Sequence, residues 1–221
     1  MQNKDHPQIK NQNQNQDKNQ TQNQTQNQSE NIKKSAGITR IKRPGLFLDR
    51  DGVIIKDVGY IKDVQQIEIY PEIIPIIKWA RNHDFFVFVV TNQAGVARGY
   101  FSEEDVVKIN NAIEEILDHR WGITIDKWYY CPFHPTKGIG YYKQESNLRK
   151  PRPGMLLEAA KEFTIDLEKS IMIGDKKSDI ILELPGLRTF LIKQNYSLDG
   201  VDKNIVYENH QQLLHHLLKG D

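Results

Sequence analysis

Two aspartates separated by one residue, Asp49 and Asp51, directly follow an apolar run at 46–48 and come just before Gly52. An apolar run that ends in acidic residues and a glycine is typical of a buried strand that leads into a turn. In an extended segment, side chains at positions i and i+2 point to the same side, and burying two ionised carboxylates without a counter-charge is costly. The pair therefore predicts a cation at the end of the strand, for which a divalent metal is the simplest candidate.

Three other polar clusters follow apolar runs or lie in the long loop at 132–153. They are Thr91 with Asn92, Arg149 with Lys150, and Asp175 with Asp179. Because the carboxyl ends of parallel strands meet at one edge of a sheet, we expect the four clusters to lie together. A single Asp-X-Asp pair is common in solvated turns, so this convergence is what favours a catalytic interpretation.

The elements that must position these clusters alternate between strand and helix. Nearly continuous apolar runs predict strands buried on both faces, and apolar residues at helical spacing predict amphipathic helices. The predicted strands lie at 46–48, 85–90, 125–131, 171–173 and 187–192, and the predicted helices at 71–80, 102–121, 155–163 and 213–218. This alternation predicts an α/β fold with a doubly wound, mostly parallel sheet and helices on both faces.

The N-terminal segment has a different composition from the rest of the 221-residue chain. Of its first thirty residues, seventeen are Asn or Gln, which leaves too little apolar surface to offset the entropy lost on ordering. We therefore expect residues 1–38 to be a disordered tail and linker, and residues 39–221 to be a single folded catalytic domain.

Composition also restricts the partners and the setting of the protein. A formal net charge of +1 gives no global basic field of the kind that binds nucleic acid. Cys131 is the only cysteine, which excludes an internal disulfide, and the sequence has neither an apolar signal-peptide core nor an apolar run long enough to span a bilayer. We expect a cytoplasmic monomer without nucleic-acid or membrane partners.

The four clusters together suit phosphoryl transfer. Asp49, Asp51 and Asp175 form an oxygen-rich site of the kind that Mg²⁺ prefers, and such a site favours an anionic, phosphorylated substrate. One aspartate can attack phosphorus while its neighbour acts as a general acid. Lys150 and the Thr91 hydroxyl can then stabilise the charge on the transferring phosphoryl group.

These motifs resemble, in order and spacing, the four motifs of the haloacid dehalogenase superfamily of phosphotransferases. The match rests on the segment 49–53, on Thr91-Asn92, on Lys150 and on the Gly-Asp-X-X-X-Asp segment at 174–179. The segments 91–101, 131–132 and 149–151 are more closely similar to the branch that holds D-glycero-D-manno-heptose 1,7-bisphosphate 7-phosphatases and histidinol-phosphatases. The resemblance implies a haloacid dehalogenase-like fold with a minimal cap.

The resemblance also implies roles for individual residues. Asp49 would be the phosphorylated nucleophile and Asp51 the acid/base, while Asp49, the Asp51 carbonyl and Asp175 would hold Mg²⁺. Asp179 would brace the metal site, and Thr91 and Lys150 would stabilise the phosphoryl group. The positions that match substrate contacts in the heptose enzymes are Asp57, Val58, Gly59, Tyr60, Asn92, Arg149 and Lys176.

One feature of that family is broken in this chain. Members often carry a structural zinc, but the four ligand positions here hold Cys131, Phe133, Ser146 and Leu148. Cys131 with the nearby His134 cannot complete a four-ligand site. We predict that zinc is absent and that Phe133, Tyr141 and Tyr142 hold the loop by packing; stoichiometric zinc in purified protein would contradict this.

The leading hypothesis is a Mg²⁺-dependent phosphatase that acts on a small phosphorylated sugar through an aspartyl-phosphate intermediate, with the 7-phosphate of the heptose bisphosphate as the first candidate. Histidinol phosphate is the nearest alternative, because the same catalytic set serves both. A polynucleotide 3′-phosphatase is less favoured, since no basic stripe with interleaved aromatic residues is visible. A non-catalytic binding module would not need all of the catalytic residue types together.

Overall fold

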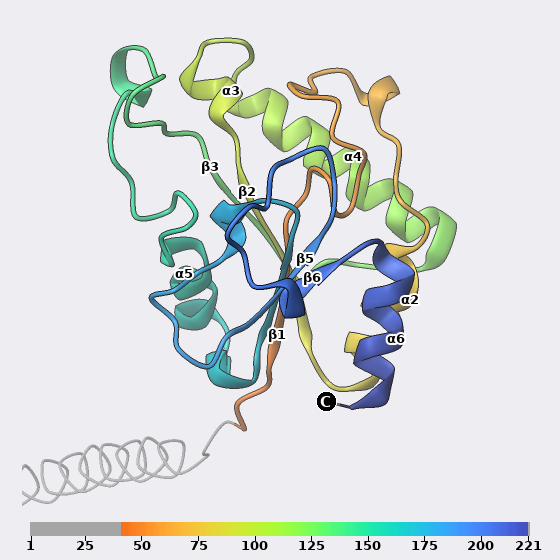
Figure 1. The fold of residues 1–221 in the computed structure, drawn as a ribbon. Helices are drawn as coiled ribbons and strands as arrows, with labels where there is room; N and C mark the ends of the chain where they lie inside the picture. The colour runs from red at the N-terminus through yellow and green to blue at the C-terminus, as the bar shows by residue number, and fades with distance from the viewer. Residues whose placement is uncertain (1–40, 221) are drawn as a thin grey trace, which may run out of the picture. The chain divides into compact units, whose positions relative to one another are not determined.

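Six strands form a single parallel sheet in the order β3-β2-β1-β4-β5-β6 in the computed structural model, which describes residues 41–220 (Figure 1). The strands are β1 (Gly45–Leu48), β2 (Phe86–Asn92), β3 (Lys127–Cys131), β4 (Ile171–Gly174), β5 (Arg188–Ile192) and β6 (Val206–Tyr207). The chain builds outward from β1 to β3 on one side, then returns to place β4 on the other side of β1. This reversal makes the sheet doubly wound, as predicted.

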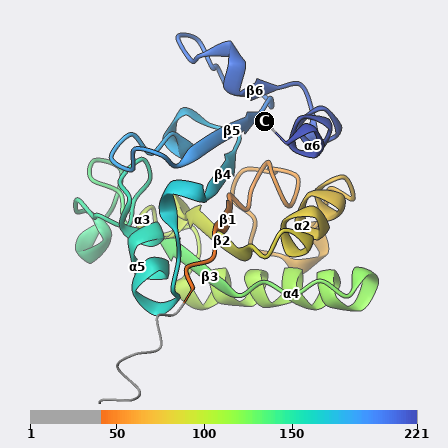
Figure 2. The same ribbon diagram turned by 90° about the horizontal axis from the view of Figure 1, so that it is seen from below.

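Helices cover both faces of the sheet (Figure 2). They are α2 (Ile73–Asn82), α3 (Ala94–Ala97), α4 (Glu103–Trp121), α5 (Gly154–Glu162) and α6 (His210–Lys219). One apolar cluster joins α2, α4 and α6 to Leu46 and Leu48, and a second joins α5 to Phe47 and Phe88. Because successive side chains of a strand point to opposite faces, the run at 46–48 supplies both layers of the core.

The helix α4 has well-defined ends that its sequence predicts. The Ser102 hydroxyl accepts a hydrogen bond from the Asp105 amide (3.3 Å), and the Asp105 carboxylate accepts one from the Ser102 amide (2.8 Å). This capping box satisfies amides that would otherwise lack partners at the first turn. At the other end, Gly122 takes a left-handed conformation (φ 62°) that glycine adopts readily.

The structure differs from the sequence-based prediction in short elements and in boundaries. The strand β3 begins at Lys127, two residues later than predicted, and α6 begins at His210, three residues earlier than its apolar stripe. The prediction did not include α3 or β6. The predicted tail at 1–38, and the domain boundary that follows it, lie outside the described residues. Within residues 41–220, no helix is both long and apolar enough to cross a membrane.

Candidate active site

The structure brings the four polar clusters together at the carboxyl edge of the sheet. Asp49 follows β1, Thr91 lies near the end of β2, Asp175 follows β4, and Lys150 reaches in from the loop between β3 and α5. Since β1 pairs in parallel with β2 on one side and β4 on the other, these strand ends are immediate neighbours. The convergence expected from the sequence is therefore present in the fold.

Lys150 is the cation at the centre of the cluster. Its ammonium lies 2.8 Å from Asp49 Oδ1 and 2.6 Å from Asp179 Oδ1, and its side chain is almost wholly buried. Burial lowers the pKa of Lys150, but the two carboxylates outweigh burial and the pKa is raised. Asn92 holds the Lys150 main chain through both ends of its amide, accepting from the Lys150 amide (3.0 Å) and donating to the Lys150 carbonyl (3.1 Å).

The carboxylates of Asp49, Asp175 and Asp179 form a cluster that fits a cation. One oxygen of each lies within 4.8 Å of the others. Asp175 is fully buried and neither of its oxygens has a hydrogen-bond partner, while the Lys176 ammonium is 3.6 Å from Oδ1. Burial, together with the nearby Asp49 charge, raises the pKa of Asp175 to about 8. A buried carboxyl that accepts no hydrogen bond on either oxygen and lies beside another acid is in the environment expected of a metal ligand.

Asp179 is used differently from Asp175. Its Oδ2 accepts hydrogen bonds from the amides of Asp175 (3.1 Å) and Lys176 (2.9 Å), while its other oxygen faces Lys150. Burial raises the pKa of Asp179, an effect that Lys150 opposes. Asp179 thus has partners on both oxygens and fixes the backbone that carries Asp175.

Two glycines let the catalytic loops approach one another. A Cβ atom on Gly52, whose φ is +91°, would lie 2.3 Å from Asp175 Oδ2. A Cβ atom on Gly174 would lie 2.2 Å from Asp179 Cβ. Both distances are too short for real contacts, so any larger residue at either position would push the carboxylate cluster apart.

Asp51 is held by residues that the sequence reasoning did not single out. The buried Arg50 guanidinium contacts its carboxylate and also donates to Asn110 on α4. The Gln93 amide donates to Asp51 Oδ2 (3.0 Å) and to the Thr91 hydroxyl (2.8 Å). The predicted acid/base therefore lies in a buried polar network that spans β1, β2 and α4.

Asp57, from the predicted substrate loop, is joined to the catalytic edge through Lys176. Its Oδ2 accepts from the Lys176 ammonium (3.0 Å) and from the Tyr196 hydroxyl (2.6 Å), and its Oδ1 accepts from the Gly59 amide (2.8 Å). Burial raises the pKa of Asp57, but these donors outweigh burial and the pKa is lowered. Tyr196 follows β5 and was not among the predicted site residues.

The other predicted substrate residues lie around this loop and the loop before α5. Val58 and Tyr60 are exposed, and the Tyr60 ring packs edge-on against Tyr100 with centroids 4.8 Å apart. Arg149 is half-buried and donates to the Phe133 carbonyl (3.1 Å). Burial is the main reason that the pKa of Arg149 is lowered. Aromatic and basic side chains thus border the catalytic edge.

The loop between β3 and α5 is held by aromatic packing, as the sequence predicts. The rings of Phe133, Tyr141 and Tyr142 lie with centroids 5.4–6.0 Å apart. The hydroxyls of Tyr142 and Tyr130 each donate to one oxygen of Glu103 at 2.9 Å, which ties the loop to the first turn of α4.

The cysteine and the histidine of this loop, the two residue types that could bind zinc there, have local hydrogen-bond partners. Cys131 Sγ donates to the Phe133 carbonyl (3.8 Å), and His134 Nδ1 accepts from the amides of Thr136 (3.3 Å) and Lys137 (3.1 Å). The predicted absence of zinc stays a prediction, which metal analysis of the purified protein can test.

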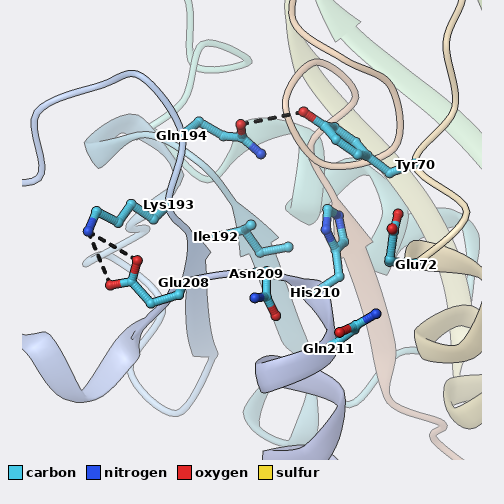
Figure 3. A pocket seen from close by; sticks show the side chains of 9 residues that line it. All are labelled: Tyr70, Glu72, Ile192, Lys193, Gln194, Glu208, Asn209, His210 and Gln211. Carbon is cyan, nitrogen blue, oxygen red and sulfur yellow. Dashed lines mark hydrogen bonds and ion pairs between the residues drawn. The ribbon is translucent and has the colours of Figure 1, made fainter.

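The main chain of the turn that follows Asp51 accepts hydrogen bonds from two side chains of the C-terminal part of the chain. Gln194 donates to the Gly52 carbonyl (3.0 Å), and the buried His210 donates through Nε2 to the Val53 carbonyl (2.7 Å). Both side chains line a pocket of about 310 Å³ between the loop after β5 and the start of α6 (Figure 3). The position of the catalytic turn thus depends on neutral polar contacts from these two residues.

Acidification is expected to destabilise the protein through His210. Burial lowers the pKa of His210 below its ordinary value, and this outweighs the opposing effects of the Val53 carbonyl and Glu72. The unfolded chain therefore binds a proton below about pH 6.5 that the folded chain resists, so the contribution of His210 to stability falls as the pH drops, by at most about 1.4 kcal/mol per pH unit. Urea denaturation at pH 7 and pH 5, compared between the parent and a variant that cannot titrate at this position, separates this loss from the effects of other groups.

The variant His210→Gln keeps a donor but cannot titrate, so it should lose less stability between pH 7 and pH 5 than the parent. His215→Gln, which changes an exposed histidine on the same helix, is the matched control and should behave as the parent. An unchanged pH dependence in His210→Gln would contradict the assignment.

Comparison with known proteins points to phosphatases throughout. The family model described as polynucleotide kinase 3 phosphatase matches residues 46–204. A D-glycero-alpha-D-manno-heptose-1,7-bisphosphate 7-phosphatase from Burkholderia mallei is 44% identical over 140 residues, which are 63% of this chain and 74% of the relative. A protein of the same name from Photorhabdus laumondii is 35% identical over 165 residues, which are 74% of this chain and 90% of the relative.

Solved structures agree with these sequence relatives. A putative haloacid dehalogenase-like phosphatase from Mesorhizobium loti has a TM-score of 0.71 and 34% identity, covering 80% of this chain and 85% of its own. The D,D-heptose 1,7-bisphosphate phosphatase from B. bronchiseptica, complexed with magnesium and phosphate, has a TM-score of 0.66 and 26% identity, covering 80% and 99%. Heptose bisphosphate 7-phosphatases are thus among the relatives of this chain. The chain is a phosphatase of the haloacid dehalogenase-like superfamily and belongs to the polynucleotide kinase 3 phosphatase family.

Proposed function

We propose that this phosphatase is Mg²⁺-dependent and hydrolyses a phosphomonoester of a small sugar phosphate through an aspartyl-phosphate on Asp49. The substrate proposed first is D-glycero-D-manno-heptose 1,7-bisphosphate, from which the 7-phosphate is removed. The observation that carries the proposal is the buried cluster in which Lys150 contacts Asp49 while neither oxygen of Asp175 has a hydrogen-bond partner. The monomeric state and cytoplasmic location stay predictions.

Asp49, the main-chain carbonyl of Asp51 and Asp175 would hold the metal ion. Their oxygen donors are the kind that Mg²⁺ prefers, and the structure of the B. bronchiseptica relative is a magnesium complex. When bound, Mg²⁺ supplies charge neutralisation that lets an anionic phosphate approach Asp49. Asp179 would orient the Asp175 backbone through the two amide hydrogen bonds that it accepts.

The protein groups then divide the reaction into two steps. An Asp49 carboxylate oxygen forms a bond to phosphorus as the bond from phosphorus to the sugar oxygen breaks, and Asp51 gives a proton to that oxygen. In the second step Asp51 takes a proton from water, whose oxygen bonds to phosphorus and releases inorganic phosphate from Asp49. Lys150 and the Thr91 hydroxyl would stabilise the charge on the phosphoryl oxygens in both steps.

The loops around this edge support a polyhydroxylated, doubly phosphorylated substrate. Lys176 and Arg149 supply positive charge. Burial lowers the pKa of Lys176, but the carboxylates around it outweigh burial and raise the pKa, so the ammonium stays protonated. Asp57 and Tyr196 offer acceptor and donor atoms that suit sugar hydroxyls. We include Val58, Gly59, Tyr60 and Asn92 in the same substrate site.

A substrate panel tests the proposal. The purified protein with Mg²⁺ is assayed against the heptose bisphosphate, histidinol phosphate and an oligonucleotide that ends in a 3′-phosphate, and kcat/KM is compared. We expect the heptose bisphosphate to be preferred by about 100-fold or more, as a site built for its polar groups would require. A higher value for histidinol phosphate would reject the sugar substrate.

The oligonucleotide is included in the panel because the matching family is described as polynucleotide kinase 3 phosphatase. Preference for that substrate would move the function to nucleic-acid repair chemistry. Failure to hydrolyse any of the three substrates would contradict the substrate proposed here.

A further inference from the structure

The carboxylate of Asp51 is clamped by its sequence neighbour Arg50. Arg50 Nε and Nη2 lie 3.0–3.3 Å from the two Asp51 carboxylate oxygens. The Arg50 side chain is 2% exposed and that of Asp51 is 14% exposed. Burying a guanidinium in a protein is costly unless its N–H groups have hydrogen-bond partners. The partner of the remaining Arg50 N–H groups therefore helps to determine where the guanidinium, and with it the Asp51 carboxylate, lies.

Asn110 pairs the far side of the guanidinium. Arg50 Nη1 donates to Asn110 Oδ1 at 2.9 Å across sixty residues of sequence. Asn110 is itself buried, in a helix whose neighbouring buried positions include Ile109 and Ile113 of the apolar core. A single amide on the buried face of a long helix therefore fixes Arg50, and through it Asp51, relative to the rigid core.

Gln93 holds Asp51 from the other direction. Its side-chain amide donates to Asp51 Oδ2 and to the Thr91 hydroxyl, and its main-chain amide donates to the Cys131 carbonyl (2.8 Å). An ionised carboxylate offers roughly four acceptor positions, so two guanidinium N–H groups and one amide leave space for a transferred proton. The network restrains Asp51 without blocking its chemistry.

We propose that Arg50, anchored by Asn110, and Gln93 are positioning residues that orient the Asp51 carboxyl group for proton transfer. The inference rests on the proposed function, in which Asp51 gives its proton to the departing sugar oxygen as the Asp49–phosphorus bond forms. Arg50 and Gln93 contribute hydrogen bonds only and exchange no proton. The Arg50 cation also stabilises the carboxylate that remains on Asp51 after the proton has left.

The test compares leaving groups. Departure of a sugar alcohol needs a proton, whereas p-nitrophenolate leaves without one, and kcat/KM reports the steps up to and including that departure. We expect Asn110→Leu and Gln93→Met to lower kcat/KM for the sugar phosphate by about 10- to 100-fold, a fraction of what acid–base catalysis supplies. For p-nitrophenyl phosphate the change in Asn110→Leu should stay within about threefold, since no proton transfer is lost. Gln93→Met also removes the donor to the Thr91 hydroxyl, so its loss with p-nitrophenyl phosphate should be smaller than its loss with the sugar phosphate but can exceed threefold.

One further variant, and the choice of two different elements for the test, keep the result interpretable. Asn110→Asp retains an acceptor for Arg50 and should recover most of the sugar-phosphate activity, and Gln93→Met acts from a different element if Asn110→Leu fails to fold. Equal losses with both substrates, or no loss with either, would overturn the inference.

The Asp51→Asn variant separates this inference from the proposed function. It should show the same leaving-group dependence more strongly than the positioning variants. If Asp51→Asn shows that dependence and the positioning variants do not, only the positioning inference fails. If Asp51→Asn shows none, the acid role of Asp51 fails, and the positioning inference fails with it.

Discussion

Replacing Asp49 by asparagine is expected to lower kcat/KM for any phosphomonoester at least about 10⁴-fold, as is usual for loss of a covalent nucleophile. The amide is nearly the same size as the carboxylate but cannot attack phosphorus. Lys150 keeps Asp179 as a partner in the variant, since both carboxylates contact its ammonium. The fold should therefore survive, and circular dichroism with a thermal melt checks that it does.

The control for this variant is Asp118→Asn, which changes an exposed carboxylate on α4 to the same amide. It should leave kcat/KM within about twofold, as for most surface substitutions. Retention of more than a few per cent of the activity by Asp49→Asn would show that another group attacks the phosphate.

Replacing Asp175 by asparagine is expected to have opposite effects on activity and on the stability of the metal-free protein. Activity should fall at least about 10³-fold because a metal ligand is lost. The melting temperature without metal should rise by about 2–8 °C, since a neutral group replaces a buried carboxyl that has no hydrogen-bond partner. The gain follows from the raised pKa of Asp175.

The pH dependence of that gain follows from the same shift. The Asp175 pKa is about 8 in the folded chain and about 3.9 when unfolded. The folded protein thus holds a proton that the unfolded chain releases, and the contribution of Asp175 to the stability of the parent falls as the pH rises from about 4 to about 8. Asp175→Asn should lack this fall, so its advantage should be larger at pH 8 than at pH 5.

Thermal melts with EDTA and with Mg²⁺ complete the test. Mg²⁺ should raise the melting temperature of the parent, because an ion that binds only the folded state stabilises it by mass action. The Asp175→Asn variant should respond far less. Equal stabilisation of both proteins by Mg²⁺ would contradict the role of Asp175 as a ligand.

The sheet could be predicted from sequence because parallel strands buried on both faces leave a strong local pattern. Each central strand is a short apolar run followed directly by polar residues, as at 46–48 before Asp49. The strand β6 has two residues and α3 has four, too few for either period to be visible. Those elements depend on contacts with distant parts of the chain, which local composition does not encode.

The site could be predicted only in part for a related reason. The residues proposed to act on phosphate have distinctive types at strand ends, whereas many of the residues that hold them are chemically ordinary and lie far away in the sequence. Asn110 lies sixty residues from Arg50, and Tyr196 lies 139 residues from Asp57. The one available signal was a polar side chain at a buried position of an otherwise apolar helical stripe, and that position is Asn110.

The order of strands in the sheet also determines when catalysis can begin during folding. Asp49, the proposed nucleophile, follows β1, the groups around it come from β2, β4 and the loop after β3, and Lys150 meets Asp49 across 101 residues. Contacts between residues so far apart in sequence form late in folding, because the entropy lost on closing the intervening loop must be offset before the contacts stabilise the protein. No N-terminal fragment that stops short of β4 contains Asp175, so enzymatic turnover should recover only as the last central strand docks.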